Sequence, residues 1–172
     1  QLLRIGYQAA AGLQAAHTAG IVHRDVNPAN IMLVLPAGSV KVLDFGLAGS
    51  VQANPRADAV TAAAAARQSS SPVGGFGVSS PVLVGTPGYM SPEQATDQYV
   101  DARSERYSLG AMLSRLASGR LPMQRDSETT PPTHAELLVR LVTDQAPSLA
   151  KYAPSTPRRL CELVDCCLRT DP

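Results

Sequence analysis

Apolar residues at the start of the chain recur at steps of three and four positions. The set consists of Leu2, Ile5, Ala9, Leu13 and Ala16. This spacing places them on one face of a helix, and Gly20 follows as a common helix terminator. The pattern therefore predicts an amphipathic helix over residues 1–19.

Two short aliphatic runs follow this helix. Residues 31–35 read Ile-Met-Leu-Val-Leu and residues 40–43 read Val-Lys-Val-Leu. Between them, residues 36–39 read Pro-Ala-Gly-Ser, a composition typical of a turn. The two runs and the turn predict a small β-hairpin.

The second half of the chain carries helical patterns. Residues 103–118 have apolar positions at helical spacing. Thr133 with Glu136 three positions later forms a capping-box signature. Thr156 followed by Pro157 reads as an N-cap with a proline at the first helical position. Together with the hairpin, these segments predict an α+β fold that is mainly α-helical.

A stretch of different composition separates the two halves. Residues 49–81 include five consecutive alanines at 62–66 and three serines at 69–71, with few large apolar side chains. Such a segment buries too little surface to offset the entropy of ordering it. We expect residues 49–81 to be a long, mobile, low-complexity insertion within a single domain.

Length, charge and cysteines exclude several classes of protein. The chain has 172 residues, 44% of them apolar, and a formal charge of +1, which gives no reason to expect nucleic acid as a partner. No apolar run approaches the roughly 20 residues of a membrane span. Cys161 and Cys167 read as core thiols, without the paired spacing of a zinc site. We expect a cytoplasmic setting, although an anchor could lie outside this segment.

Polar residues with phosphoryl-transfer chemistry flank the predicted hairpin. Residues 23–25 read His-Arg-Asp, Asn30 follows just before the hairpin, and residues 44–46 after it read Asp-Phe-Gly. Phosphoryl transfer needs a carboxylate that orients the attacking hydroxyl and hard oxygen ligands for Mg²⁺. The hairpin would direct Asp25, Asn30 and Asp44 into one cleft.

These motifs and their order resemble the protein kinase family. Residues 23–30 match the pattern H-R-D-x-x-x-x-N, and residues 44–46 match D-F-G. The segment 85–93, Gly-Thr-Pro-Gly-Tyr-Met-Ser-Pro-Glu, resembles the substrate-docking loop, and 101–110 resembles the start of the central helix. Pro28 and the docking loop look like the serine/threonine branch rather than the tyrosine branch, and the chain as a whole resembles the bacterial type of these kinases. The resemblance implies a C-terminal lobe (residues 1–172), with the N-terminal lobe absent from this sequence.

The resemblance also implies roles for individual residues. The implied catalytic residues are Asp25, Asn27 and Thr86, and the implied ligands of the cofactors ATP and Mg²⁺ are Asn30 and Asp44. Arg24 would be a regulatory residue that pairs with a phosphate on the insertion. The implied substrate-docking residues are Gly85, Thr86, Pro87, Tyr89 and Glu93. The implied partners are protein substrates with Ser or Thr hydroxyls and the N-terminal lobe of the same polypeptide.

Several residues depart from the family pattern. Asn27 stands where a lysine is usual, and Glu105 stands where an aspartate is usual, followed by Arg106 in place of an apolar residue. We expect the start of that helix to be looser than usual, and Glu93 to lack its arginine partner. These departures keep a pseudokinase, a binding module without phosphate transfer, open as an alternative. We also expect this segment alone to bind Mg-ATP weakly.

The remaining histidines carry no motif. His17 and His134 read as surface or helix-end residues without a ligand partner, and His23 reads as a packing element.

Overall fold

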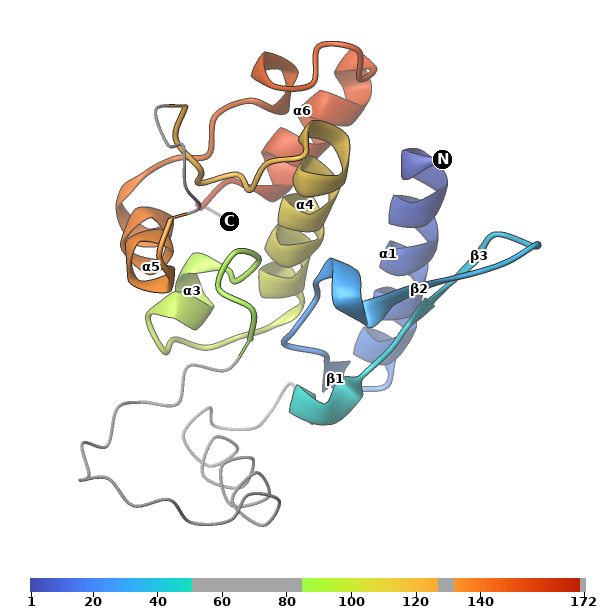
Figure 1. Cartoon of the computed structure of the whole chain (residues 1–172). Helices are drawn as coiled ribbons and strands as arrows, with labels where there is room; N and C mark the ends of the chain where they lie inside the picture. Colours follow the sequence, from blue (N-terminus) through green and yellow to red (C-terminus); the bar gives the residue numbers. More distant parts are fainter. Residues whose placement is uncertain (51–84, 127–131, 171–172) are drawn as a thin grey trace, which may run out of the picture.

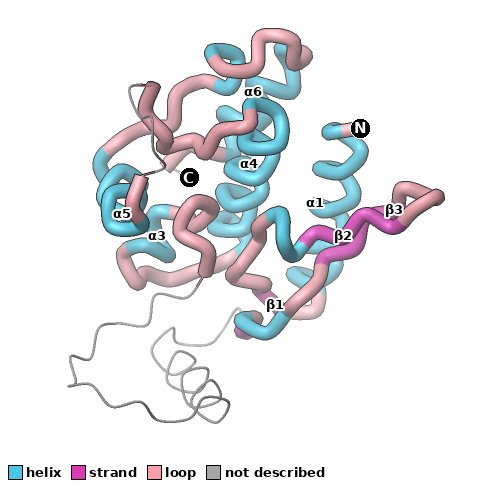
Figure 2. Tube along the Cα trace, in the orientation of Figure 1, coloured by secondary structure: helices cyan, strands magenta, loops and turns pink. Residues whose placement is uncertain are grey.

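The computed structural model describes residues 1–50, 85–126 and 132–170 as a mainly helical structure with two small antiparallel strand pairs (Figures 1 and 2). The helices are α1 (Leu2–Thr18), α3 (Pro92–Ala95), α4 (Ala102–Ser118), α5 (His134–Thr143) and α6 (Arg158–Cys167). The strands are β1 (Ile21–Val22), β2 (Ile31–Val34), β3 (Ser39–Val42) and β4 (Gly49–Ser50). Short 3-10 helices are η1 (Pro28–Asn30), η2 (Phe45–Leu47) and η3 (Leu149–Lys151). The predicted fold class, mainly helical with a small hairpin, is confirmed.

Helix α4 forms the centre of the molecule. It packs against α1 on one side and α6 on the other, as Figure 1 shows. The buried core includes Ala9, Tyr107, Met112, Leu113, Leu160, Val164 and Leu168. A Cβ at Gly110 would lie 2.7 Å from the Cβ of Cys167, so glycine allows α4 and α6 to approach this closely.

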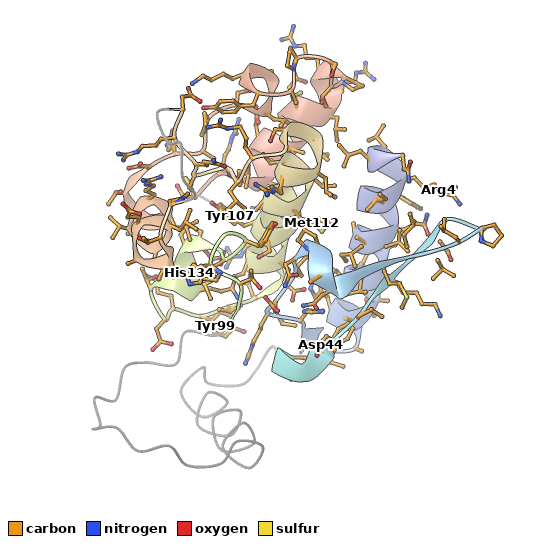
Figure 3. All side chains as sticks on the ribbon, in the orientation of Figure 1. Arg4, Asp44, Tyr99, Tyr107, Met112 and His134 are labelled. Carbon is orange, nitrogen blue, oxygen red and sulfur yellow. The ribbon has the colours of Figure 1, made fainter. Side chains whose placement is uncertain are left out.

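The predicted hairpin is the pair β2–β3, in a register that runs from Ile31 opposite Val42 to Val34 opposite Ser39. It lies against α1, where the Val40 N–H donates to Oε1 of Gln8 at 2.9 Å. Arg4, labelled in Figure 3, donates to the carbonyl of Ala37 in the turn at 2.6 Å. Helix α1 therefore fixes the hairpin, and with it the loops at the hairpin's inner end.

The predicted insertion over residues 49–81 lies almost entirely outside the described residues. Its first two residues form β4, which pairs with β1 so that Val22 lies opposite Gly49. This pairing joins the chain after the hairpin to the strand that precedes the His-Arg-Asp loop.

The two predicted helix caps have different outcomes. The capping box of α5 is confirmed, because the Thr133 hydroxyl accepts from the Glu136 N–H and the Glu136 carboxylate accepts from the Thr133 N–H. The prediction that Thr156 caps α6 is wrong. Pro157 has extended backbone angles (φ −53, ψ 132) and is itself the N-cap residue, without a side-chain cap bond, so α6 begins one residue later than predicted.

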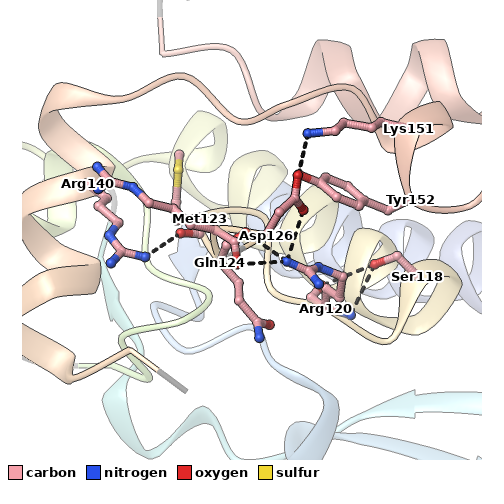
Figure 4. Close-up of polar contacts among 9 residues, drawn as sticks. Ser118, Arg120, Met123, Gln124, Asp126, Arg140, Lys151 and Tyr152 are labelled. Carbon is pink, nitrogen blue, oxygen red and sulfur yellow. Dashed lines mark hydrogen bonds and ion pairs between the residues drawn. The ribbon is translucent and has the colours of Figure 1, made fainter. Parts of the chain in front are cut away.

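Two arginines hold the segment that follows α4 (Figure 4). The Arg120 guanidinium donates to the carbonyls of Gln124 and Arg125, and the buried Arg140 of α5 donates to the carbonyl of Met123 at 3.0 Å. Arg120 therefore holds this segment together internally, and Arg140 ties it to α5.

The cysteines differ in their burial. Cys161 is buried in the core as expected, Cys167 is half-buried and Cys166 is exposed. Burial raises the pKa of the Cys167 thiol, an effect that the positive charge of Arg106 partly opposes.

Within the described ranges, no helix combines the length and the apolar character needed to cross a membrane.

Candidate active site

His23 ties the His-Arg-Asp loop to the end of the hairpin. Its side chain is fully buried, and Nε2 is hydrogen-bonded to the carbonyl oxygen of Leu43 at 2.7 Å. The imidazole also packs at a tilted angle against Phe45, with ring centroids 4.6 Å apart. His23 thus has the packing role expected for it, and it joins the loop before the hairpin to the loop after it.

The carboxylate of Asp25 is held by two segments of the chain. Its Oδ1 accepts from the Thr86 N–H at 3.0 Å and from the Thr86 hydroxyl at 2.8 Å. Its Oδ2 accepts from Nδ2 of Asn30 at 3.0 Å, and the same Nδ2 lies 2.8 Å from the Asp25 carbonyl oxygen. The structure therefore brings together Asp25, Asn30 and Thr86, although Thr86 is 61 positions away from Asp25.

Asn27 lies inside this group. It is buried, and its Oδ1 accepts from the Ala29 N–H at 2.8 Å as the N-cap of η1. Its Nδ2 is 3.2 Å from the carbonyl oxygen of Asp25 and 3.1 Å from Oγ1 of Thr86. Asn27 is therefore hydrogen-bonded to Asp25, Ala29 and Thr86 at once.

Asp44 and Asn30 lie at the same end of the hairpin. The last strand pair at this end is Ile31 opposite Val42. The next residues are also joined, because the N–H of Leu43 donates to the Asn30 carbonyl at 2.8 Å. Asp44 has left-handed backbone angles (φ 58, ψ 70), and its Oδ1 accepts from the Gly46 N–H at 3.1 Å. Figure 3 shows the exposed Asp44 side chain at this end of the molecule.

Two side-chain oxygens at this end are available to a ligand. Among the described residues, no hydrogen bond engages Oδ1 of Asn30 or Oδ2 of Asp44. An amide oxygen and a carboxylate oxygen are ligands that Mg²⁺ accepts, with the remaining positions filled by substrate phosphates and water. The described part of the chain holds no cluster of three His, Cys, Asp or Glu side chains suited to a metal.

The segment 85–93 crosses directly over the His-Arg-Asp loop. Gly85 has φ +123, and a Cβ there would lie 3.0 Å from the Cε of Met90 and 3.3 Å from the carbonyl oxygen of Arg24. Pro87 and Tyr89 are both half-buried. Burial raises the pKa of Tyr89, partly opposed by the positive charge of Arg115. The segment is thus packed against the loop that carries Asp25.

A glutamine not identified from the sequence anchors this segment. Nε2 of Gln94 donates to the Arg24 carbonyl at 2.8 Å. Gln94 also forms a capping box with Ser91 at the start of α3. The Ser-x-x-Gln spacing is a recognisable cap signature, but nothing in it indicates the bond to Arg24.

Glu93 has a hydrogen-bond partner other than the arginine of the family pattern. Its Oε1 accepts from the Ser104 hydroxyl of α4 at 2.6 Å. Nearby, burial and the negative charge of Glu93 raise the pKa of the buried Tyr107, labelled in Figure 3. Ser104 therefore links the end of the docking segment to the central helix.

Glu105 is anchored at the start of α4, where the sequence suggested a looser helix. Its carboxylate is 2% exposed, Oε1 accepts from the Arg24 N–H at 2.8 Å, and Oε2 lies 2.5 Å from Nε2 of His17. His17, expected to be a surface or helix-end residue, lies half-buried near the end of α1 with this carboxylate as its hydrogen-bond partner. Asp101 caps α4 with a complete capping box, and Arg106 points to solvent. The longer glutamate side chain is accommodated in the core.

Arg24 is held at both backbone polar groups. It has φ 70, a left-handed conformation that is uncommon for a residue other than glycine. Glu105 accepts from its N–H and Gln94 donates to its carbonyl, so α4 and α3 fix the peptide that immediately precedes Asp25.

A model of the protein kinase domain matches residues 1–172. The chain belongs to the protein kinase family. It is 36% identical over 149 residues to a probable serine/threonine-protein kinase of Corynebacterium efficiens, covering 80% of this chain and 19% of that protein. It is 35% identical over 161 residues to the serine/threonine-protein kinase PknL of Mycobacterium tuberculosis, covering 94% of this chain and 33% of PknL.

A third relative, the serine/threonine-protein kinase PksC of Streptomyces coelicolor, is 40% identical over 125 residues, covering 73% of this kinase chain and 19% of PksC. The chain thus spans about a third or less of the length of these relatives. Protein kinases generally use ATP and Mg²⁺, which agrees with the two oxygens available at the end of the hairpin.

Proposed function

We propose that this chain is the C-terminal, catalytic lobe of a serine/threonine protein kinase, which transfers the γ-phosphate of ATP to Ser or Thr hydroxyls of protein substrates. The observation that carries this proposal is the arrangement of Asp25. Its carboxylate is fixed by Asn30 and Thr86 beside the end of the hairpin that bears Asp44. The family membership and the names of the relatives support it.

Asp25 is the group that would orient the substrate hydroxyl and accept its proton. Thr86 occupies Oδ1 with two hydrogen bonds, whereas Oδ2 has one bond, from Asn30. A carboxylate oxygen accepts more than one hydrogen bond, so Oδ2 retains capacity for an incoming hydroxyl. A carboxylate held in one position supports this role, because a general base must stay within hydrogen-bond reach of the substrate hydroxyl.

Asn30 and Asp44 are the residues that would hold the metal. Their available oxygens lie at the same end of the hairpin, and the Asn30 amide nitrogen is directed toward Asp25. Mg²⁺ bound there would offset the negative charge of the ATP phosphates. The N-terminal lobe of the same polypeptide would complete the nucleotide site, and we expect this chain alone to bind Mg-ATP weakly.

The segment 85–93 would dock the protein substrate. Thr86 contacts Asp25 directly, and Gln94 and Ser104 anchor the end of the segment. Arg24 would pair with a phosphate on the segment that precedes residue 85, which lies outside the described residues.

A pseudokinase is the second candidate, favoured by the neutral Asn27. Against it, Glu105 makes its contact with the Arg24 N–H despite its departure from the family pattern. Asp25, Asn30 and Asp44, the side chains that phosphate transfer needs most, are all present.

Phosphate transfer by the full-length protein tests the proposal. We expect the wild type to label a Ser/Thr-containing substrate from γ-labelled ATP, and Asp25→Asn to reduce kcat by about 100-fold or more, because the general base is lost. Asp126→Asn, which changes an exposed carboxylate in the segment after α4, is the matched control and should keep wild-type activity. A wild type without transfer would favour the pseudokinase, and an active Asp25→Asn would contradict the role of Asp25.

A further inference from the structure

The amide of Asn27 is fully used within the protein. An asparagine amide has two N–H donors and one acceptor oxygen. Nδ2 of Asn27 reaches the Asp25 carbonyl at 3.2 Å and the Thr86 hydroxyl at 3.1 Å, while Oδ1 accepts from the Ala29 N–H at 2.8 Å. The residue is only 4% exposed. No donor of this side chain remains for a phosphate.

The contact with Thr86 determines which way the Thr86 hydroxyl donates. A hydroxyl has a single hydrogen, so an oxygen that accepts from Asn27 uses its own hydrogen elsewhere. That hydrogen goes to Oδ1 of Asp25, 2.8 Å away. The result is a directed chain of hydrogen bonds from Asn27 through Thr86 to the carboxylate, in which each bond polarises the next.

We propose that Asn27 is a positioning residue, which orients the Asp25 carboxylate through Thr86 and does not contact the nucleotide phosphates. This inference rests on the proposed function, and it changes the catalytic role that the sequence suggested for Asn27. A lysine at this position would bring positive charge to the transferring phosphate. Asn27 brings none, and its contribution is the geometry of the carboxylate.

The capping bond of Asn27 must be separated from its bridging bonds. Oδ1 caps η1, and its loss would disturb the loop irrespective of Thr86. Serine is as good an N-cap residue as asparagine, but it lacks the two donors. The variant Asn27→Ser therefore keeps the cap and removes the bridge, whereas Asn27→Ala removes both.

Kinetics of the full-length protein provide the first test. We expect Asn27→Ser to lower kcat roughly 10-fold, because a small misplacement of a catalytic group is costly, while the KM for ATP stays within about twofold of wild type. Thr86→Val removes the hydroxyl that the bridge acts through. The double variant Asn27→Ser, Thr86→Val should therefore be no slower than Thr86→Val alone. Thr143→Ala, at the exposed end of α5, is the control and should match wild type.

Amide exchange provides a second test that does not depend on activity. The Thr86 N–H donates to Oδ1 of Asp25, so its hydrogen–deuterium exchange reports on the carboxylate. We expect exchange at Thr86 to be faster in Asn27→Ser than in wild type, and unchanged in Thr143→Ala.

The proposal is overturned if Asn27→Ser keeps kcat within twofold of wild type, or if it raises the KM for ATP more than fivefold. It is also overturned if the decreases in kcat caused by Asn27→Ser and by Thr86→Val multiply in the double variant. Unchanged exchange at Thr86 would overturn it as well. A wild type without phosphate transfer would instead contradict the proposed function, and the exchange rate at Thr86 would then decide the positioning role by itself.

Discussion

Single residues decide how the His-Arg-Asp loop is held. The motif residues and their candidate roles could be read from the sequence because the spacing of His23, Asp25 and Asn30 carries the signal. The side chain that supports the peptide before Asp25 could not be read in the same way. Glu105 suggested a loosened helix, yet it is buried and bonded to the Arg24 N–H and to His17. Glutamate is one methylene longer than the aspartate of the family pattern, and the packing around Glu105 accommodates the difference. A sequence pattern does not describe such packing.

Removal of this carboxylate should therefore destabilise the fold. We expect Glu105→Ala to lower the free energy of unfolding by about 1–3 kcal/mol, because the Arg24 N–H and His17 lose a buried acceptor. The matched control is Arg106→Ala, whose exposed side chain is adjacent in sequence and should change stability by no more than about 0.5 kcal/mol. Urea denaturation measures both. Equal stabilities for the two variants would show that Glu105 does not support the loop.

Helices and strands were largely predictable from periodicity and cap signatures. The hairpin β2–β3, the helix α4 and the capping box of α5 all lie where the sequence indicates. The short elements α3, β1 and β4 were not predicted, and the start of α6 was predicted wrongly, because Thr156 and Pro157 match a cap signature in the sequence. The extended backbone at Pro157 shifts the helix start by one residue, and a local pattern contains no information about the angle at which a chain enters a helix.

The two threonines give a direct comparison of the cap that forms with the cap that does not. Thr133→Ala should reduce stability by about 1 kcal/mol, since its hydroxyl accepts from the Glu136 N–H at the start of α5. Thr156→Ala should change stability by less than about 0.5 kcal/mol, because no side chain caps α6. Thermal unfolding of the two variants checks the difference. A greater loss for Thr156→Ala than for Thr133→Ala would contradict these cap assignments.

At the scale of the whole molecule, the site depends on contacts between distant segments. Thr86 reaches Asp25 across 61 positions, Gln94 reaches Arg24 across 70, and Glu105 reaches His17 across 88. These pairings follow from the packing of α3 and α4 against the loop after α1. Contacts of this kind leave no periodic pattern in the sequence. The family motifs indicated which residues would meet, and the structure adds the side chains that hold them in place.

The central claim is that Asn30 and Asp44 share one metal-bound nucleotide beside Asp25. Iron-mediated cleavage of the full-length protein tests it most directly: Fe²⁺ replaces Mg²⁺ in the presence of ATP, ascorbate and peroxide generate radicals at the metal, and mass spectrometry maps the broken peptide bonds. We predict ATP-dependent cleavage next to both residues 30 and 44, lost in Asp44→Asn and kept in Asp126→Asn. Cleavage confined to other segments, or cleavage that Asp44→Asn leaves unchanged, would contradict the account.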